Sequence, residues 1–299
     1  MSTTRRKPRI GITRGDCAGI GPEIVERALK SDRLPNSAEY KLVGKYPECS
    51  LGQPAPEPAR AAAAALEEAV TLARRGEIDA IVTGPVHKAR MYEVGFRFPG
   101  QTEFFAERCG VKNFAMCLTG GSLTVALVTA HIPLLKVPRA LKQSEIVRVG
   151  LLVAEFACSR GKTASRIAVA GLNPHAGESG KLGREEIEII GPAIEELNAS
   201  PVTRHLSLVC AGPVSPDTVF NRALDGEFDA VLCMYHDQGL IPLKLHAFHS
   251  GVNVTLGLPF PRTSPDHGTA FEIAGKGIAR PDSMIAAINL AEELAAKSS

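Results

Sequence analysis

The sequence has 299 residues, of which 44% are hydrophobic and 22% charged, so it can bury a sizeable core. That length suits one large domain or two lobes that share a cleft. The formal net charge of +2 argues against nucleic-acid or anionic-membrane binding, since both need a concentrated basic surface.

The cysteines and the N-terminus indicate the compartment. The seven cysteines are scattered, odd in number and without a CxxC pair. This pattern is typical of free thiols in a reducing compartment rather than of a disulfide framework. The basic N-terminus, MSTTRRKPR, leads into a short predicted strand instead of an apolar signal core. Because no apolar run is long enough to cross a bilayer, we expect a soluble, cytoplasmic protein.

Short β-rich runs alternate with helical patterns along almost the whole chain. Predicted strands cover residues 9–13, 41–44, 79–84, 124–131, 166–171, 207–212, 229–236 and 253–257. Predicted helices cover residues 23–30, 61–75, 146–159 and 184–197, and the Pro- and Ala-rich stretch 53–65 is predicted to be a loop feeding a helix. Several strands are apolar on both faces, as central parallel strands are. The alternation therefore predicts an α/β fold with a mainly parallel sheet.

Histidines follow four of the predicted strands, at His87, His131, His175 and His236. In open α/β sheets ligands bind at the carboxyl ends of strands. Neutral imidazoles from separate strand ends can converge on one divalent cation and leave positions open for substrate. A lone histidine in such a place is more often a hydrogen-bonded loop residue, and no HExxH signature occurs. The pattern alone leaves a metal site and structural roles equally open.

Two further segments could bind an anion. GDCAGIGPE, at residues 15–23, follows the first strand and enters a helix, so its backbone N–H groups could face a ligand. It matches neither GxGxxG nor the P-loop pattern, and a tight glycine turn explains it equally well. Lys244, Asn253 and Arg262 could converge on a phosphate, with Arg262 offering bidentate geometry; taken singly, each is expected at the surface.

Two acidic residues are candidate catalytic groups. Asp217 in GPVSPDTVF and Asp237 beside His236 could accept a proton or support a metal ligand. Asp217 could equally cap the helix predicted for the TVFNRAL segment that follows it.

Together these segments resemble the 4-hydroxythreonine-4-phosphate dehydrogenase family. The motifs that carry the resemblance are, in order, GDCAGIGPE, TGPVHKA, TEFFAERCG, LNPHAGESGKLGREE, PVSPDTVF, YHDQGLIPLK and GVNVTLGLPFPRTSPDHGTAFEIAGKG. The last motif also resembles the cofactor loop of isopropylmalate and isocitrate dehydrogenases. The resemblance implies the two-lobed α/β fold of those enzymes, with a mainly parallel sheet and an active-site cleft between the lobes. Residues 1–112 would form an outer lobe completed by 252–299, and residues 113–251 the metal-binding and dimerisation lobe.

The resemblance also implies a set of site residues. The metal ligands would be His131, His175 and His236, in a site built from both subunits of a homodimer, and His87 would have a nearby or structural role. The metal would be zinc, cobalt or magnesium. Substrate would be bound by Gln101, Thr102, Lys244, Asn253 and Arg262, and NAD or NADP by His267, Gly268, Thr269 and Glu272, with Glu272 facing the adenosine ribose. Asp237 and Asp217 would be the catalytic candidates.

The implied reaction is NAD(P)- and metal-dependent oxidation of 4-phosphooxy-L-threonine to 2-amino-3-oxo-4-phosphooxybutanoate. That product decarboxylates to 3-amino-2-oxopropyl phosphate in vitamin B6 biosynthesis. Family members usually have histidine where this chain has Gln101, which can donate a hydrogen bond but cannot become a cation. The substitution keeps open a dehydrogenase for threonate or erythronate 4-phosphate, or for another related hydroxy acid or diol. The chain is also short between Gly44 and Arg60, which predicts a trimmed loop in the outer lobe.

Two other classes remain in competition. Phosphate acyltransferases are more distantly related in fold, but they do not need three strand-end histidines or this cofactor loop. A non-enzymatic binding module or an inactive paralogue would have to keep the metal, phosphate and cofactor motifs without using them.

Overall fold

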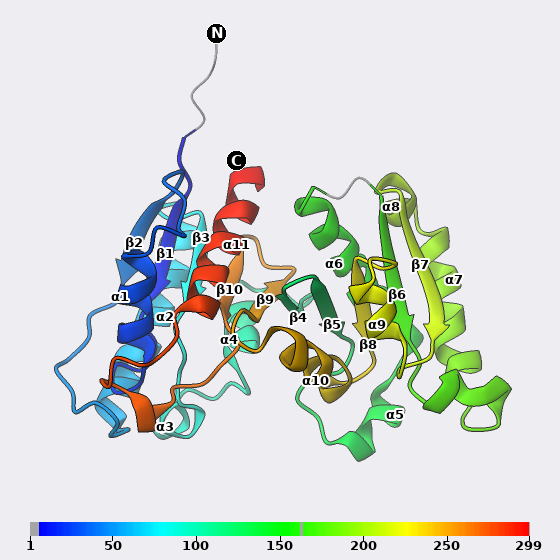
Figure 1. Ribbon diagram of the computed structural model, residues 1–299, viewed down its shortest axis with the longest axis horizontal. Helices are drawn as coiled ribbons and strands as arrows, with labels where there is room; N and C mark the ends of the chain where they lie inside the picture. The colour runs from blue at the N-terminus through cyan, green and yellow to red at the C-terminus, as the bar shows by residue number, and fades with distance from the viewer. Residues whose placement is uncertain (1–5, 162–163, 299) are drawn as a thin grey trace, which may run out of the picture. The chain divides into compact units, whose positions relative to one another are not determined.

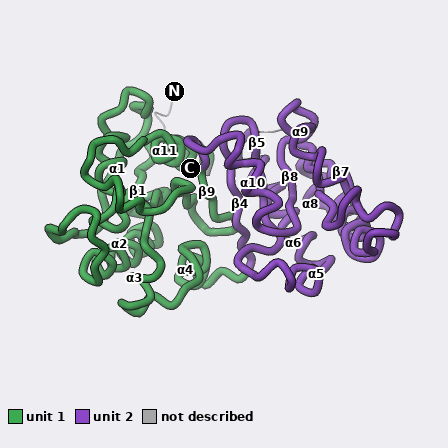
Figure 2. Tube along the Cα trace, turned by 60° about the horizontal axis from the view of Figure 1, so that its bottom comes forward, with its two compact units in different colours: residues 1–112, 252–299 green, residues 113–251 purple. Residues whose placement is uncertain are grey.

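The computed structural model describes residues 6–161 and 164–298. The chain forms two compact units, residues 1–112 with 252–299 (unit 1) and residues 113–251 (unit 2), which Figure 2 colours separately. Each unit has a β-sheet with helices packed against it (Figure 1). The predicted α/β class is confirmed.

Unit 1 has the strand order β2-β1-β3-β10-β9, in which the first four strands are parallel and β9 runs antiparallel to β10. Its strands are β1 (Arg9–Thr13), β2 (Glu39–Val43), β3 (Ala80–Thr83), β9 (Val252–Leu256) and β10 (Arg262–Pro265). Its helices are α1 (Gly21–Leu29), α2 (Pro56–Arg74), α3 (Lys88–Glu93), α4 (Gln101–Arg108), η4 (Phe271–Ile273) and α11 (Asp282–Ser298). The buried side chains of Phe104 and Phe105 belong to the core of unit 1 and hold helix α4 in place.

Unit 2 has the strand order β4-β5-β8-β6-β7, an antiparallel pair β4–β5 followed by parallel pairs. Its strands are β4 (Ala115–Gly120), β5 (Leu123–Leu127), β6 (Ser165–Ala170), β7 (Leu208–Val214) and β8 (Ala230–Cys233). Its helices are η1 (Leu134–Lys136), α5 (Val137–Ala140), α6 (Gln143–Ser159), η2 (Pro174–Gly180), η3 (Glu186–Ile190), α7 (Gly191–Ala199), α8 (Pro201–His205), α9 (Val219–Leu224) and α10 (His236–Ala247).

Helix α2 shows how the sequence specifies one of these elements. Pro56 stands in its first turn, where a missing N–H costs nothing, and buried alanines and Leu66 share one face. Gly76, just past the helix, has a φ of 66°, a left-handed conformation that suits glycine at a helix end. The loop predicted for residues 53–65 covers only 53–55, because Pro56 and Pro58 already lie in the first turn of α2.

Other boundaries also differ from the predictions. Strand β5 ends at Leu127, so the predicted strand 124–131 was too long. Strand β8 ends at Cys233, and His236 begins helix α10. Strands β4 and β10 were not predicted; the RTSP sequence of β10 lies among prolines that disguise it.

The predicted free thiols are confirmed, since all seven cysteines are unpaired. Among the described residues, every helix is too short or too polar to cross a membrane. The cytoplasmic location stays a prediction.

Candidate functional site

The carboxyl ends of three strands in unit 2 are neighbours, because β8 pairs in parallel with β5 on one side and β6 on the other. His131 follows the end of β5 by four residues, His236 follows β8 by three, and His175 follows β6 by five. The topology therefore brings the segments that carry all three predicted metal ligands to one edge of the sheet, the edge where α/β proteins bind ligands.

Hydrogen bonds tie these strand ends together. The Thr129 hydroxyl donates to the Met234 carbonyl at 2.7 Å, joining the segment before His131 to the segment before His236. The buried amide of Gln238 accepts from the Met234 N–H at 2.6 Å and donates to the Gly171 carbonyl at 2.7 Å. One side chain thus links the ends of β8 and β6.

His131 and His236 lie side by side, with ring centroids 5.8 Å apart. Asp237 places Oδ1 2.7 Å from Nδ1 of His236. A carboxylate on Nδ1 sets the tautomer and the ring orientation, which leaves Nε2 as the atom that can bind a metal. This contact gives Asp237 a supporting role for His236 that the sequence left open.

His175 lies in a left-handed turn, and its charge acts on Asp217, which follows β7. A hydrogen bond from Ser215, assisted by the charge of His175, lowers the pKa of Asp217. Within residues 6–161 and 164–298, no group of three or more His, Cys, Asp or Glu side chains is close enough to hold a metal. The structure brings His131 and His236 together but does not assemble the three-histidine set in one chain.

Among the predicted substrate residues of unit 1, Gln101 contacts Arg262 at the start of β10. The guanidinium is buried and donates to the Thr83 hydroxyl at 2.6 Å, the Thr255 hydroxyl at 3.3 Å and Oε1 of Gln101 at 2.8 Å. It lies 5.2 Å from the ring centre of Phe105, within cation–π range. These partners are all neutral, so they orient the cation without neutralising it.

The charge of Arg262 is therefore available to an anion. Burial lowers the pKa of Arg262 to about 9, while the charge of Glu103 acts in the opposite direction, so the side chain is a cation at neutral pH. Its buried Nε–H has no hydrogen-bond partner. Leaving such a donor unsatisfied costs free energy, which an oxyanion ligand would remove.

The other predicted substrate residues differ in their surroundings. Thr102 is buried and contacts the Thr255 hydroxyl at 3.3 Å. Asn253 on β9 has a buried Oδ1 without a hydrogen-bond partner, which suits a donor such as a hydroxyl or ammonium group better than a phosphate oxygen. Lys244 belongs to helix α10 of unit 2. Its phosphate contact stays a prediction.

The predicted cofactor loop packs on the glycine-rich segment. The Ile20 N–H donates to the Thr269 carbonyl at 2.9 Å, and a Cβ at Gly19 would lie only 2.7 Å from that oxygen. This close approach explains why residue 19 is a glycine. It agrees with the interpretation of GDCAGIGPE as a tight glycine turn. Gly268 and Glu272 are exposed, and Nδ1 of His267 lies 3.1 Å from the Gly268 carbonyl. Cofactor binding at these residues stays a prediction.

Sequence reasoning overlooked Asp16, Thr83 and Thr255. Burial raises the pKa of Asp16, whose Oδ2 has no hydrogen-bond partner, and its charge interacts with His87. The His87 ring packs edge-on against Phe271 at 5.2 Å, beside the predicted cofactor loop. Asp16 lies inside the glycine-rich motif and Thr83 ends strand β3, so only their places in a motif and at a strand end could have indicated a functional role.

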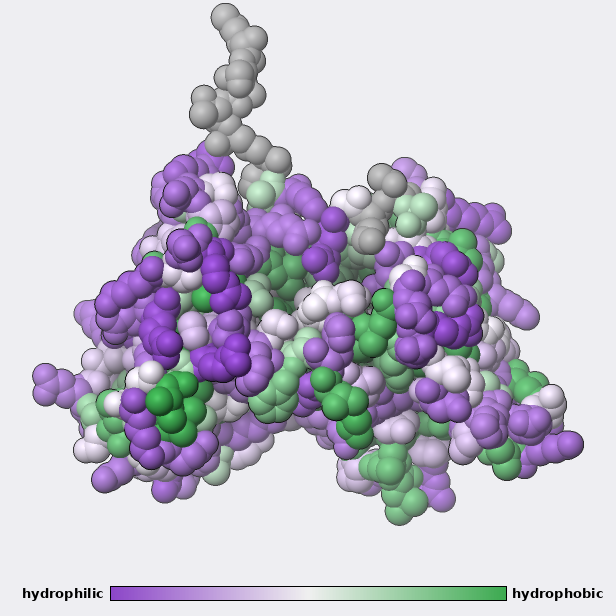
Figure 3. Space-filling view, viewed as in Figure 1, coloured by the Kyte–Doolittle hydropathy of each residue, from purple (hydrophilic) through white to green (hydrophobic). Residues whose placement is uncertain are grey.

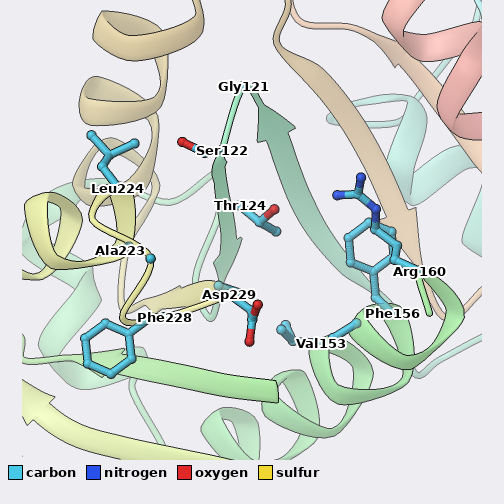
Figure 4. A pocket seen from close by; sticks show the side chains of 13 residues that line it. Gly121, Ser122, Thr124, Val153, Phe156, Arg160, Ala223, Leu224, Phe228 and Asp229 are labelled. Atoms are coloured by element: carbon cyan, nitrogen blue, oxygen red, sulfur yellow. The ribbon is translucent and has the colours of Figure 1, made fainter. Parts of the chain in front are cut away.

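A cavity of about 370 Å³ lies at the opposite edge of the unit 2 sheet (Figure 4). Its walls include Thr124 at the start of β5, Asp229 just before β8, and Phe156 and Arg160 at the end of α6. These are the amino ends of the strands, so the cavity is separate from the histidine-bearing edge.

Comparison with known proteins identifies the family. The family model described as pyridoxal phosphate biosynthetic protein PdxA matches residues 22–291. A 4-hydroxythreonine-4-phosphate dehydrogenase from Caulobacter vibrioides is 42% identical over an alignment of 331 positions including gaps, which covers 96% of this chain and 98% of that protein. The crystal structure of a 4-hydroxythreonine-4-phosphate dehydrogenase from Klebsiella pneumoniae is 36% identical, with a TM-score of 0.79 over 96% of this chain and 99% of that chain.

The wider fold is shared with an isocitrate dehydrogenase from Methylococcus capsulatus, at 16% identity and a TM-score of 0.52 over 93% of this chain and 83% of that chain. At that identity the likeness shows the fold alone, and the expected isocitrate dehydrogenase-like class is confirmed. The chain itself belongs to the PdxA family of pyridoxal phosphate biosynthetic proteins.

Proposed function

We propose that this protein oxidises 4-phosphooxy-L-threonine to 2-amino-3-oxo-4-phosphooxybutanoate with NAD or NADP and a divalent metal, as a step of vitamin B6 biosynthesis. The keto acid then loses carbon dioxide to give 3-amino-2-oxopropyl phosphate. Family membership over nearly the whole chain carries the proposal. The histidine-bearing edge of unit 2 and the buried Arg262 of unit 1 support it.

A divalent metal fits the histidine pair. His236 has Nδ1 engaged by Asp237, and the ring of His131 lies next to it. Imidazole nitrogens suit zinc and cobalt, whereas magnesium prefers oxygen ligands. Two nitrogens are fewer than the three protein ligands of a typical catalytic zinc site. We therefore propose that the set His131, His175 and His236 is completed between the two subunits of a homodimer.

An exposed apolar surface in unit 2 supports this homodimer. Ile241, Leu245 and Phe248 are spaced along one face of α10 and its end, with 66%, 89% and 69% of each residue exposed. Leu134 and Leu135, three and four residues after His131, are also exposed. Figure 3 shows apolar side chains over α10 and over η1. Both patches follow closely after a metal-ligand candidate, so a second copy covering them would reach the histidines.

The proposed roles of the site residues follow from the contacts within each unit. In unit 1, Arg262 binds the phosphate as a cation already oriented by Thr83, Thr255 and Gln101. His131, His175 and His236 would hold the metal, which would supply Lewis-acid chemistry, and the nicotinamide cofactor would supply the hydride-transfer chemistry. Asp237 orients His236, and Asp217 is the candidate acceptor of the hydroxyl proton.

Gln101 favours a second candidate, a dehydrogenase for threonate or erythronate 4-phosphate. Its Oε1 accepts a hydrogen bond from Arg262, so this position adds no charge to the phosphate site. The same phosphate site and chemistry would serve a sugar acid that lacks the amino group.

Turnover of the two substrates side by side tests the proposal. We expect metal-loaded protein to reduce NAD or NADP with 4-phosphooxy-L-threonine, followed as the absorbance of the reduced cofactor. Turnover of erythronate 4-phosphate alone would transfer the assignment to the second candidate. No turnover of either substrate with zinc, cobalt or magnesium would contradict both candidate functions.

The His236→Ala variant should lose most of its bound metal and its turnover, because the nitrogen that Asp237 orients is removed. Asp237→Asn should weaken metal binding by about 10- to 100-fold, the usual effect of removing a partner of a ligating histidine. Metal content is measured by elemental analysis after dialysis. His205→Ala, an exposed histidine on α8, is the matched control. Normal metal content and activity in His236→Ala would overturn the assignment.

The Arg262→Lys variant should raise the KM for the phosphorylated substrate by about 10- to 100-fold, because lysine cannot give bidentate hydrogen bonds. The measurement is steady-state kinetics, with Arg75→Lys at an exposed position as the control. An unchanged KM in a folded Arg262→Lys protein would show that the phosphate binds elsewhere.

The Leu245→Glu variant should shift the protein toward monomers and weaken metal binding in parallel, since a carboxylate would be buried in the apolar surface between copies. Light scattering after size-exclusion chromatography measures the mass, and Val202→Glu on α8 is the control. A dimer of unchanged stability would contradict the proposed interface.

A further inference from the structure

We propose that Glu186 is a positioning residue for His175: its buried carboxylate holds the turn that carries this histidine in the conformation that binds metal. The inference rests on the proposed metal site. It adds a residue that contacts neither the metal nor the substrate, and whose effect passes through the backbone of residues 172–179.

The turn that carries His175 has an unusual backbone. Five consecutive residues, 175–179, have positive φ angles of 50°, 50°, 80°, 45° and 56°. Only Gly177 among them is a glycine. For the other four, a left-handed conformation costs free energy, because Cβ approaches the following carbonyl oxygen. Such a run persists only where surrounding contacts impose it, and runs of this kind gather at functional sites.

Glu186 supplies those contacts. Its Oε1 accepts hydrogen bonds from the backbone N–H groups of Leu172 and Asn173, both at 2.7 Å, and its Oε2 accepts from the Asn173 amide at 2.9 Å. Glu186 is 4% exposed, so these charge-assisted bonds form away from water. The carboxylate therefore fixes the backbone at the point where the chain leaves β6 and enters the turn.

The same carboxylate also lies against the middle of the turn. A Cβ placed on Gly177 would come within 2.6 Å of Oε2 of Glu186, and a Cβ on Gly171 within 3.2 Å of Oε1. Any side chain at Gly177 would displace the carboxylate. The turn is thus shaped around Glu186 from its start to its centre.

The surroundings hold Glu186 itself in place. It begins η3, a π-helix, and such helices are rare and frequently occur at functional sites. The neighbouring Glu185 accepts a second hydrogen bond from the Asn173 amide at 2.8 Å. The start of the segment, at Gly171, is held from the other side. Gln238, two residues after His236, donates a hydrogen bond to the Gly171 carbonyl. A change at Glu186 would therefore be transmitted to His175 while the His236 segment stays fixed.

The test is the metal affinity of Glu186→Gln, measured by competition of the metal-free protein with a chromophoric chelator for zinc or cobalt. Glutamine keeps the size of the side chain but turns one acceptor into an NH₂ group facing N–H donors. We expect metal affinity to fall by about 10- to 100-fold, as for other partners of metal ligands, with turnover recovered at excess metal. Glu188→Gln, an exposed residue of the same π-helix, is the matched control and should bind metal like the wild type.

A purely structural role for Glu186 would lower thermal stability but leave the metal affinity of the folded protein unchanged. That result, beside a wild type that binds metal, would overturn this inference alone. Absence of metal binding in the wild type would overturn the proposed metal site and this inference with it. If Glu186→Gln does not fold, Asn173→Ala, which removes only the side-chain link to both carboxylates, should still weaken metal binding, and unchanged affinity there would overturn the inference.

Discussion

The parallel pairing of β8 with both β5 and β6 is the constraint on which the candidate metal site depends. It makes three strand ends adjacent, and a histidine follows each of them within five residues. The hydrogen bonds of Thr129 and Gln238 then join the three strand ends. The chemistry proposed for this protein follows from that edge, since imidazoles held by a rigid sheet can bind a metal without reorganising.

Unit 1 contains a buried positive charge, the guanidinium of Arg262. Arg262 is oriented by two threonine hydroxyls and one amide oxygen, none of which carries a charge. A carboxylate partner would stabilise the free protein but would compete with a phosphate for the guanidinium. The hydrogen-bond partners of Arg262 are neutral, and its unpaired Nε–H can donate to an anion. That arrangement suits a ligand site better than a structural ion pair.

Much of the fold could be predicted from local sequence patterns, and the errors have identifiable causes. The run RIGIT was predicted as a strand with the bounds that β1 has, because its apolar residues are continuous and its ends are marked by polar ones. The RTSP strand was missed because proline is a poor strand former in general, although Pro265 lies only at the end of β10. The strand-end histidines were recognised even though β5 and β8 end at Leu127 and Cys233, earlier than the predicted ends at 131 and 236.

The contacts that shape the site could not be predicted, because they join residues far apart in the chain. No local pattern indicates that Gln238 binds Gly171 or that Thr83 binds Arg262. Taken alone, Arg262 was expected at the surface, whereas it is buried, because three separate segments, β3, α4 and β9, close around it. The absence of a three-residue metal cluster within residues 6–161 and 164–298 is likewise a property of the folded chain.

The most direct test of the central claim is the crystal structure of the cobalt-loaded protein, with anomalous scattering recorded at the cobalt edge. The account predicts one strong peak per subunit, about 2.0 to 2.2 Å from Nε2 of His236 and close to the ring of His131. Cobalt bound elsewhere, with both imidazoles free of metal, would contradict the proposed site.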